Sequence, residues 1–320
     1  MAIVEALSLQ KPAWLNLVIG ELGQISVQRL LELSASYYPE GHQLRRADYL
    51  EWLYVHNPHG RAKLVVIIEP DGSYSGMTAL VPFRVVLGNQ TIGTRYILNV
   101  LVHPAQRGRN LFFHMMTAAV AEAHKHGEWA IGHPNDASYP VCIKTNMKFR
   151  AGLNLLVRPS GFGERLRGYR CVWQAGDSDN HLMGYDFGTL AEWRRSIGHP
   201  VLLADEEFLR WRYTRHPTRS YRLYFRLEKG RLTDYFVMRR IYIGFNLAVD
   251  WQGSEIWRLG PSVPRATTLV PWPNAAIPRP RFLFNLGLAK KKYRFYTTVA
   301  AGLDDDEPCS YMTLGASDIG

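Results

Sequence analysis

Apolar and polar positions alternate along the first half of the chain in a way that predicts strands and helices. Three apolar stretches, Lys63–Glu69, Gly76–Val86 and Arg95–Val102, have the length and β-branched content of strands. A helical period follows over Leu111–His126, and a short apolar run at Trp129–Gly132 predicts another strand. A strand, a crossover helix and a second strand in this order imply a parallel pair, so we expect a mixed α/β fold.

An internal repeat connects the two halves of the chain. The segments Tyr49–Tyr54 and Phe208–Tyr213 match at an offset of 159 residues, and each is closed by a proline four residues later. A strand, a turn and a second strand follow in both halves. We expect two copies of one fold, with domains at 1–160 and 161–320; chance similarity between two aromatic helices is the alternative.

The rest of the second half is less regular. Gly161–Asp179 is expected to be a connection and Leu190–Ser196 a short helix. The stretch Pro261–Pro280 contains six prolines and cannot be a regular helix. Two runs of like charge, Lys290–Lys292 and Asp304–Glu307, are most simply solvated loops or strand ends.

Composition narrows the class of protein. The chain has 38 Lys and Arg against 28 Asp and Glu, a net charge of +10, which favours a polyanionic partner without identifying it. Its basic clusters are short and scattered, so a nucleic-acid binder is the weakest hypothesis. No apolar run is long enough for a membrane span, and the N-terminus does not resemble a secretory signal. Three widely spaced cysteines argue against a disulfide framework or a zinc site, and a cytoplasmic location fits best.

One segment carries recognisable chemistry. The predicted strand ending at Val102 runs into a basic loop that contains Gly108, and a helix begins at Leu111. Unpaired backbone N–H groups converge at a helix N-terminus and bind phosphate there, and Arg107 and Arg109 add charged donors. The residues alone leave an ordinary strand-to-helix turn with solvated arginines equally open.

The P-x-x-R-G-x-x-L pattern from Pro104 to Leu111 resembles the cofactor loop of the Gcn5-related N-acetyltransferases, the GNAT superfamily, which normally reads R-G-x-G-x-G or R-G-x-G-x-A. Two later segments, His133–Ser138 and Lys144–Phe149, are similar to the family's last conserved block. The resemblance covers about residues 47–158. Together with the second, degenerate copy, it implies a tandem GNAT protein of bacterial type. The implied fold has a mixed central sheet whose parallel strands splay apart, flanked by helices.

The resemblance also implies a cofactor, acetyl-CoA or another acyl-CoA. Its pyrophosphate would lie on the loop backbone, and its pantetheine arm would pair with the strand edge that the splay exposes. The implied cofactor-binding residues are Val100, Leu101, Val102, Gln106, Arg107, Gly108, Arg109, Asn110, Leu111 and Asn135.

The chain departs from the family in both the loop and the catalytic positions. Asn110 replaces the second loop glycine, a change that asparagine tolerates in a left-handed conformation, and Phe112 replaces a Gly or Ala. The tyrosine that often protonates the departing thiolate falls on Cys142, and Tyr139, one turn earlier, is our preferred substitute. For the general base we consider His133 and His103, although each could be an ordinary loop histidine.

The sequence therefore predicts an acyl-CoA-dependent N-acyltransferase. It would move an acyl group to a primary amine of a small molecule, such as an amino sugar, by direct attack on the thioester. The alternative is a non-catalytic module of the same fold that binds a ligand or a partner. No metal and no membrane partner are expected, and a homo-oligomer is left open.

Overall fold

The structure is a computed structural model that describes residues 12–158, 168–243, 245–253, 267–273, 284–285 and 297–301. The chain divides into two compact units. Unit 1 consists of residues 1–84, 93–149 and 299–304, and unit 2 of residues 85–92, 150–298 and 305–320.

Unit 1 is built on a mixed sheet with the strand order β1-β2-β3-β4-β5-β14. Strands β4 and β5 are parallel, whereas β1 with β2, β2 with β3, and β14 with β5 are antiparallel. The strands are β1 (Leu17–Gly20), β2 (Lys63–Ile68), β3 (Tyr74–Leu87), β4 (Gln90–Val102), β5 (Trp129–Gly132) and β14 (Thr297–Ala301). The parallel pair expected from the sequence is confirmed, and β4 begins five residues earlier than predicted.

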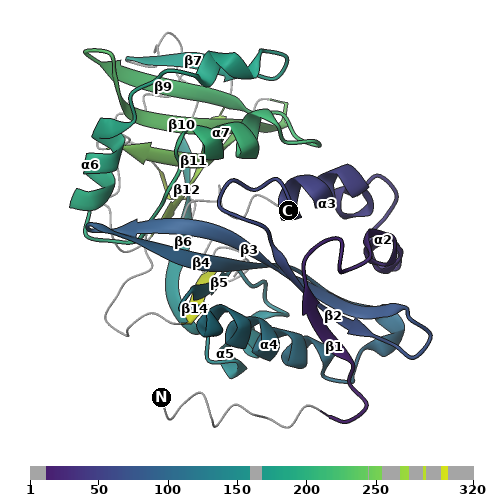
Figure 1. Ribbon diagram of the computed structural model, residues 1–320. Helices are drawn as coiled ribbons and strands as arrows, with labels where there is room; N and C mark the ends of the chain where they lie inside the picture. Colours follow the sequence, from purple (N-terminus) through teal and green to yellow (C-terminus); the bar gives the residue numbers. More distant parts are fainter. Residues whose placement is uncertain are drawn as a thin grey trace. The chain divides into compact units, whose positions relative to one another are not determined.

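Helices cover both faces of this sheet (Figure 1). Helices α2 (Val27–Ala35) and α3 (Ala47–Tyr54) lie on one face, and α4 (Leu111–Lys125) and α5 (Tyr139–Lys144) on the other. Two 3₁₀ turns complete the unit, η1 (Gln43–Arg45) and η2 (Pro104–Gln106). Helix α4 connects β4 to β5 and is the crossover helix that the sequence predicts; Gly127 follows it with φ 66°.

The core of unit 1 lies between α4 and the sheet. Met115 and Ala119 of α4 are fully buried and belong to one cluster with Val65 and Ile67 of β2. A Cβ added to Gly76 would lie 2.9 Å from the Met115 sulfur, so this glycine allows α4 to pack closely. Burial of such apolar side chains supplies most of the stability that fixes the loop before α4.

Unit 2 contains a second mixed sheet, with the strand order β6-β12-β11-β10-β9-β7. Only β11 and β12 form a parallel pair among the strand pairs described for this sheet. Its strands are β6 (Lys148–Arg158), β7 (Tyr169–Gln174), β9 (Arg222–Glu228), β10 (Arg231–Tyr242), β11 (Phe245–Gly253) and β12 (Thr267–Pro273). Two short strands pair outside this order, β8 (Val201–Leu202) with the end of β3 and β13 (Phe284–Asn285) with β6.

The helical elements of unit 2 are short. They are η3 (Asp179–Leu182), α6 (Gly188–Ser196), α7 (Glu206–Leu209) and the π-helical turn η4 (Arg210–Thr214), which continues α7. The sequence predicts the repeated aromatic helix here and the short helix at Leu190–Ser196, and both form.

The expectation that Gly161–Asp179 is only a connection is wrong for Tyr169–Gln174, which form β7 and pair with β9. Tyr169 and Trp173 are buried, but Cys171 between them is exposed and lies at a bulge in the pairing with β9, so no regular period of two marks this segment as a strand. Of the proline-rich stretch, only Thr267–Pro273 is described, and it is an extended strand. Lys290–Lys292 and Asp304–Glu307 lie outside the described residues.

The internal repeat is also visible in side-chain contacts. The rings of Tyr49 and Trp52 are 5.4 Å apart, and those of Phe208 and Trp211, 159 residues later, are 5.6 Å apart. Each aromatic pair is followed by an antiparallel strand pair, β2 with β3 and β9 with β10. The same local packing at the same offset favours a duplication over chance similarity.

Candidate active site

The loop between β4 and α4 has a tightly turned backbone. Gly108 has φ 85°, a conformation that side chains other than glycine rarely adopt. Asn110, the N-cap of α4, has φ 58° and ψ 20°. The expectation that asparagine takes a left-handed conformation in place of glycine is therefore confirmed. His103 is committed to the same turn, because its Nδ1 accepts a hydrogen bond from Ala105 N (3.3 Å).

Six consecutive backbone N–H groups are unpaired at this point. Within the part of the chain that the structure describes, the N–H groups of Gly108–Phe113 donate no hydrogen bond, and the next one, of His114, donates to Asn110 O (3.2 Å). They lie at the N-terminal end of α4, where the helix dipole favours negative charge. The loop therefore offers an anion a set of donors that no protein group occupies.

The two loop arginines have different surroundings. Arg107 is exposed, and its guanidinium lies 5.4 Å from the centre of the Tyr37 ring. Arg109 lies 4.5 Å from the Trp14 ring centre, forms an ion pair with Glu69 (3.3 Å) and donates to the Gln106 side chain. Arg109 thus holds the loop in shape, whereas Arg107 has the more available charge.

Beyond this loop, the parallel strands part. Thr94–Ile97 of β4 pair with Trp129–Gly132 of β5, and β4 then continues to Val102 after the described pairing has ended. Asn99, with φ 54°, interrupts the regular strand just past the last pair. The backbone of Val100–Val102 consequently presents hydrogen-bonding groups on the β5 side that no described strand uses.

The side chains near this gap separate onto two faces. On the α4 face, Leu111 and Cys142 belong to the unit 1 core cluster, and Val100, Val102 and Tyr139 pack against it. The structure thus brings together residues that the sequence places in the cofactor loop, the strand edge and the catalytic set. His133 lies on the other face, with its ring stacked 5.3 Å from that of Tyr96.

Besides His103, three groups were candidates for proton transfer from the sequence. Burial lowers the pKa of His133 to about 4, so its imidazole is neutral at pH 7. Burial raises the pKa of the Cys142 thiol to about 11. Tyr139, the first residue of α5, is only partly buried. These differences separate the three chemically, because only Tyr139 combines an acidic hydroxyl with partial exposure.

Asn135 has a structural task. Its side-chain oxygen accepts hydrogen bonds from Ala137 N (3.1 Å), Ser138 N (2.9 Å) and Ser138 Oγ (2.9 Å). These contacts turn the chain from β5 into α5 and so position Tyr139.

A hydrogen bond that the sequence did not predict joins α3 to the irregular part of β4. Asn99 Nδ2 donates to Tyr54 Oη (2.9 Å), and Tyr54 is fully buried. Burial raises the pKa of Tyr54, so the phenol stays protonated. Tyr54 is the last residue of α3, the repeated aromatic helix. Its recurrence as Tyr213 was the feature of the sequence that could have indicated its role.

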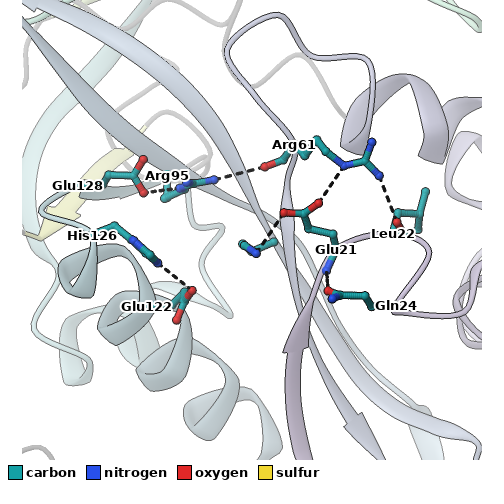
Figure 2. Close-up of polar contacts among 9 residues, drawn as sticks. Glu21, Leu22, Gln24, Arg61, Arg95, Glu122, His126 and Glu128 are labelled. Atoms are coloured by element: carbon teal, nitrogen blue, oxygen red, sulfur yellow. Dashed lines mark hydrogen bonds and ion pairs between the residues drawn. The ribbon is translucent and has the colours of Figure 1, made fainter.

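Carboxylates near the parallel pair are held in ion pairs. Figure 2 shows Glu128 with Arg95 and Glu21 with Arg61, and both pairs lie away from the parted strand ends. Strands β4 and β5 contain no Asp or Glu. These two strands therefore offer no carboxylate as a general base.

No three His, Cys, Asp or Glu side chains among the described residues gather closely enough to hold a metal ion. Of the helices described, none has both the length and the apolar composition that a bilayer crossing requires.

A mixed sheet with parted parallel strands and an anion-binding loop at the start of the crossover helix defines a GNAT-type fold. Residues 27–141 match the model of the acetyltransferase (GNAT) domain family. This segment begins at the first residue of α2 and ends within α5, so it includes the loop, both parted strands and Tyr139. No curated protein sequence matches the chain significantly.

Solved structures resemble about nine tenths of the chain. A GCN5-related N-acetyltransferase from Kribbella flavida is 13% identical, with a TM-score of 0.63 over 91% of this chain and 72% of the other. A probable N-acyltransferase from Enterococcus faecalis V583 is 12% identical, with a TM-score of 0.59 over 89% and 72%. A tandem GNAT protein from the clavulanic acid biosynthesis pathway is 13% identical, with a TM-score of 0.52 over 91% and 100%. Residues 27–141 therefore match a GNAT domain, and the chain has the tandem GNAT fold.

Proposed function

We propose that the chain is an acyl-CoA-dependent N-acyltransferase whose cofactor binds in unit 1. The observation that carries this proposal is the combination of six unpaired N–H groups at Gly108–Phe113 with an unpaired strand edge at Val100–Val102. A ligand that is both a pyrophosphate and an extended amide chain matches both features. Acyl-CoA has this composition, and acetyl-CoA is the simplest example.

In this proposal the pyrophosphate accepts hydrogen bonds from the loop N–H groups, and Arg107 neutralises part of its charge. The pantetheine amides pair with β4 at Val100–Val102, which places the thioester in the gap between β4 and β5. Backbone N–H groups at the gap stabilise the oxyanion that forms during attack. Leu101, Gln106 and Arg109 shape this cofactor site.

The reaction follows from the two faces of the gap. The acceptor amine attacks the thioester carbonyl, the new C–N bond forms, and the C–S bond breaks. Tyr139, on the α4 face, donates a proton to the departing thiolate, since its side chain is partly exposed whereas that of Cys142 is buried. His133, on the opposite face, accepts the proton of the attacking nitrogen after attack, when that nitrogen is strongly acidic. The acceptor class is a small primary amine such as an amino sugar.

Calorimetric titration with acetyl-CoA tests the binding step. We expect the variant Arg107→Gln to bind about tenfold more weakly, because it loses one charge-assisted phosphate contact. Arg46→Gln is the matched control, because Arg46 is exposed at the start of α3 and paired with Asp48. Equal affinities in the two variants, or no binding by the wild-type chain, would contradict the proposed cofactor site.

Release of free thiol from acetyl-CoA over a panel of primary amines tests the transfer step. We expect Tyr139→Phe to lower kcat by about a hundredfold with the affinity for acetyl-CoA unchanged, and Cys142→Ala to change kcat little. The absence of any carboxylate in β4 and β5 favours a second candidate, a GNAT-fold module that binds its ligand without turnover. Binding of acetyl-CoA without thiol release from any amine would support that module.

A further inference from the structure

Two exposed aromatic side chains lie beside the anion-binding loop of unit 1. Trp14 is 54% exposed and Tyr37 is 52% exposed. Each contacts a different arginine of the loop: the Arg109 guanidinium lies 4.5 Å from the Trp14 ring centre, and that of Arg107 lies 5.4 Å from the Tyr37 ring centre. Single exposed aromatic residues are common on protein surfaces, so the informative feature is their position beside this loop rather than their exposure.

The chain segment before β1 fixes the position of Trp14. Leu15 N donates a hydrogen bond to Pro12 O (2.9 Å), which closes a turn with Trp14 at its third position. Leu15 is buried in the core cluster of unit 1, and β1 begins two residues later at Leu17. The residues that follow Trp14 are thus anchored in the core, while the indole itself stays at the surface.

Arg109 supports one face of the indole. Its guanidinium also forms an ion pair with Glu69 and donates to the Gln106 side chain, so three contacts hold it in place. A cation over an aromatic face contributes a modest attraction at an exposed site. Because its charge is already paired with Glu69, Arg109 has less to offer a phosphate than Arg107 has. Its contacts instead keep Trp14 next to the loop.

The rest of the indole surface is open to a ligand. Among the described residues, Arg109 is the one ring or cation contact that Trp14 makes. Since the guanidinium covers one face, much of the exposed area belongs to the opposite face and the edge. Arg109 also contributes its backbone N–H to the unpaired set Gly108–Phe113. The exposed indole therefore lies one arginine side chain away from the phosphate donors, a span similar to the one between the phosphates and the base of a nucleotide.

We propose that Trp14 forms a stacking site for the nucleobase of the bound cofactor, which is adenine in acyl-CoA. The inference rests on the proposed cofactor site and adds to it a subsite for the nucleotide half of the ligand. A purine stacks on an exposed indole through its π-face, and such a contact strengthens binding. Tyr37 is not assigned this role, because Arg107 would leave its ring to reach the phosphates, whereas Arg109 stays paired with Glu69.

The test compares two ligands, CoA and phosphopantetheine, which lacks the adenine nucleotide. Calorimetric titration measures the Kd of each. We expect Trp14→Leu to raise the Kd for CoA about tenfold and to leave the Kd for phosphopantetheine unchanged within about twofold. Trp14→Phe, which keeps an aromatic ring, should restore most of the affinity for CoA. Etheno-CoA, whose modified adenine is fluorescent, gives a measure that does not depend on phosphopantetheine: binding should quench it strongly in the wild type and weakly in Trp14→Leu.

Tyr37→Leu is the matched control, because Tyr37 is similarly exposed and also contacts an arginine of the loop. Its ratio of the two Kd values should equal that of the wild type. An equal loss of affinity for both ligands in Trp14→Leu would show that the indole only supports Arg109, and would overturn the inference alone. Unchanged affinity for CoA, or a selective loss in Tyr37→Leu instead, would also overturn it. A wild-type chain that binds neither ligand would overturn the inference together with the proposed function.

Discussion

A buried tyrosine occurs at the same position of the repeat in both halves of the molecule, but its hydrogen-bond partner differs between them. Tyr54 in unit 1 and Tyr213 in unit 2 are 159 residues apart, and neither is exposed. Tyr54 accepts a hydrogen bond from the partly exposed Asn99, whereas Tyr213 donates to the fully buried carboxylate of Asp250 (2.7 Å). Tyr235 also donates to Asp250 (3.0 Å). The tyrosine of the first half is therefore bonded to a neutral amide beside the gap, and that of the second half to a carboxylate buried in the core.

The strands part in the second half as well. The parallel pairing of β11 with β12 covers Phe245–Leu247 and Thr267–Leu269, and both strands continue past it. The residues of β11 beyond this point, Ala248–Gln252, are at most 3% exposed. Arg194 of α6 donates to the side chain of Gln252, which itself donates to Leu202 O (2.8 Å).

Some features of the unit 1 gap belong to the fold, and others are specific to a ligand site. Parted parallel strands occur in both halves, so they belong to the duplicated scaffold. At the unit 1 gap, the loop N–H groups of Gly108–Phe113 have no protein partner among the described residues. In the second half, the polar side chains of Asp250 and Gln252 are bonded within the protein, whereas the buried side-chain nitrogen of Asn246 on β11 has no described partner. We infer that the second half is structural and that the first binds ligands.

We expect the largest effect on stability from alanine substitutions of Asn99 and Asp250, the hydrogen-bond partners of Tyr54 and Tyr213. Asp250→Ala removes the carboxylate that accepts from the buried hydroxyls of Tyr213 and Tyr235, and we expect a loss of about 3–5 kcal/mol in the free energy of unfolding. Asn99→Ala removes one bond at a partly exposed site and should cost about 1 kcal/mol. Urea denaturation of both variants measures the difference. Equal losses would mean that the two tyrosine contacts are energetically equivalent.

Bound acetyl-CoA should protect the first half of the molecule, and not the second, from amide hydrogen exchange. Acetyl-CoA at a hundred times its Kd should stabilise the native state by about 2.7 kcal/mol. Amide hydrogen exchange should slow in Val100–Val102 and at the start of α4, and stay unchanged in β10 and β11. Titration should give one cofactor per chain. Protection of β11, or two cofactors per chain, would contradict the assignment of ligand binding to unit 1 alone.

One position of the repeat should make the stability of the protein depend on pH. His216 in unit 2 corresponds to Asn57 in unit 1, and both side chains accept a backbone N–H from two residues later, of Thr218 (3.2 Å) and His59 (2.9 Å). Burial, with the charges of three arginines behind it, lowers the pKa of His216 to about 2. The unfolded histidine binds a proton below about pH 6.5 and the folded one does not, so stability falls as the pH drops from 6.5 towards 2.

The substitution His216→Asn tests this prediction, because it keeps an acceptor for Thr218 N and removes the titrating group. Between pH 7 and pH 5, the variant should lose about 2 kcal/mol less stability than the wild type. Thermal unfolding at both pH values provides the measurement. Identical losses would show that His216 is protonated in the native state or that other groups control the acid limb.

Local patterns in the sequence predicted local structure well. Strand β5 has the predicted bounds, α4 begins at the predicted residue, and Asn110 takes the left-handed conformation that its position implied. The loop could be predicted because its chemistry depends on neighbouring residues. Long-range pairing could not: β14 joins β5 from more than 160 residues away, and Asn99 reaches Tyr54 only because β4 is irregular.

We expect the smallest effect when the first half receives the type of partner found in the second half, a carboxylate. In Asn99→Asp, the new carboxylate would accept a hydrogen bond from the protonated Tyr54 hydroxyl, as Asp250 does from Tyr213. Because Asn99 is partly exposed, the charge would keep some hydration, and the free energy of unfolding at pH 7 should change by less than about 1 kcal/mol. A loss of several kcal/mol on urea denaturation would show that the unit 1 gap tolerates a charge no better than an apolar core. In that case the difference between the two halves would lie in the side chains around Tyr54 rather than in the exposure of its partner.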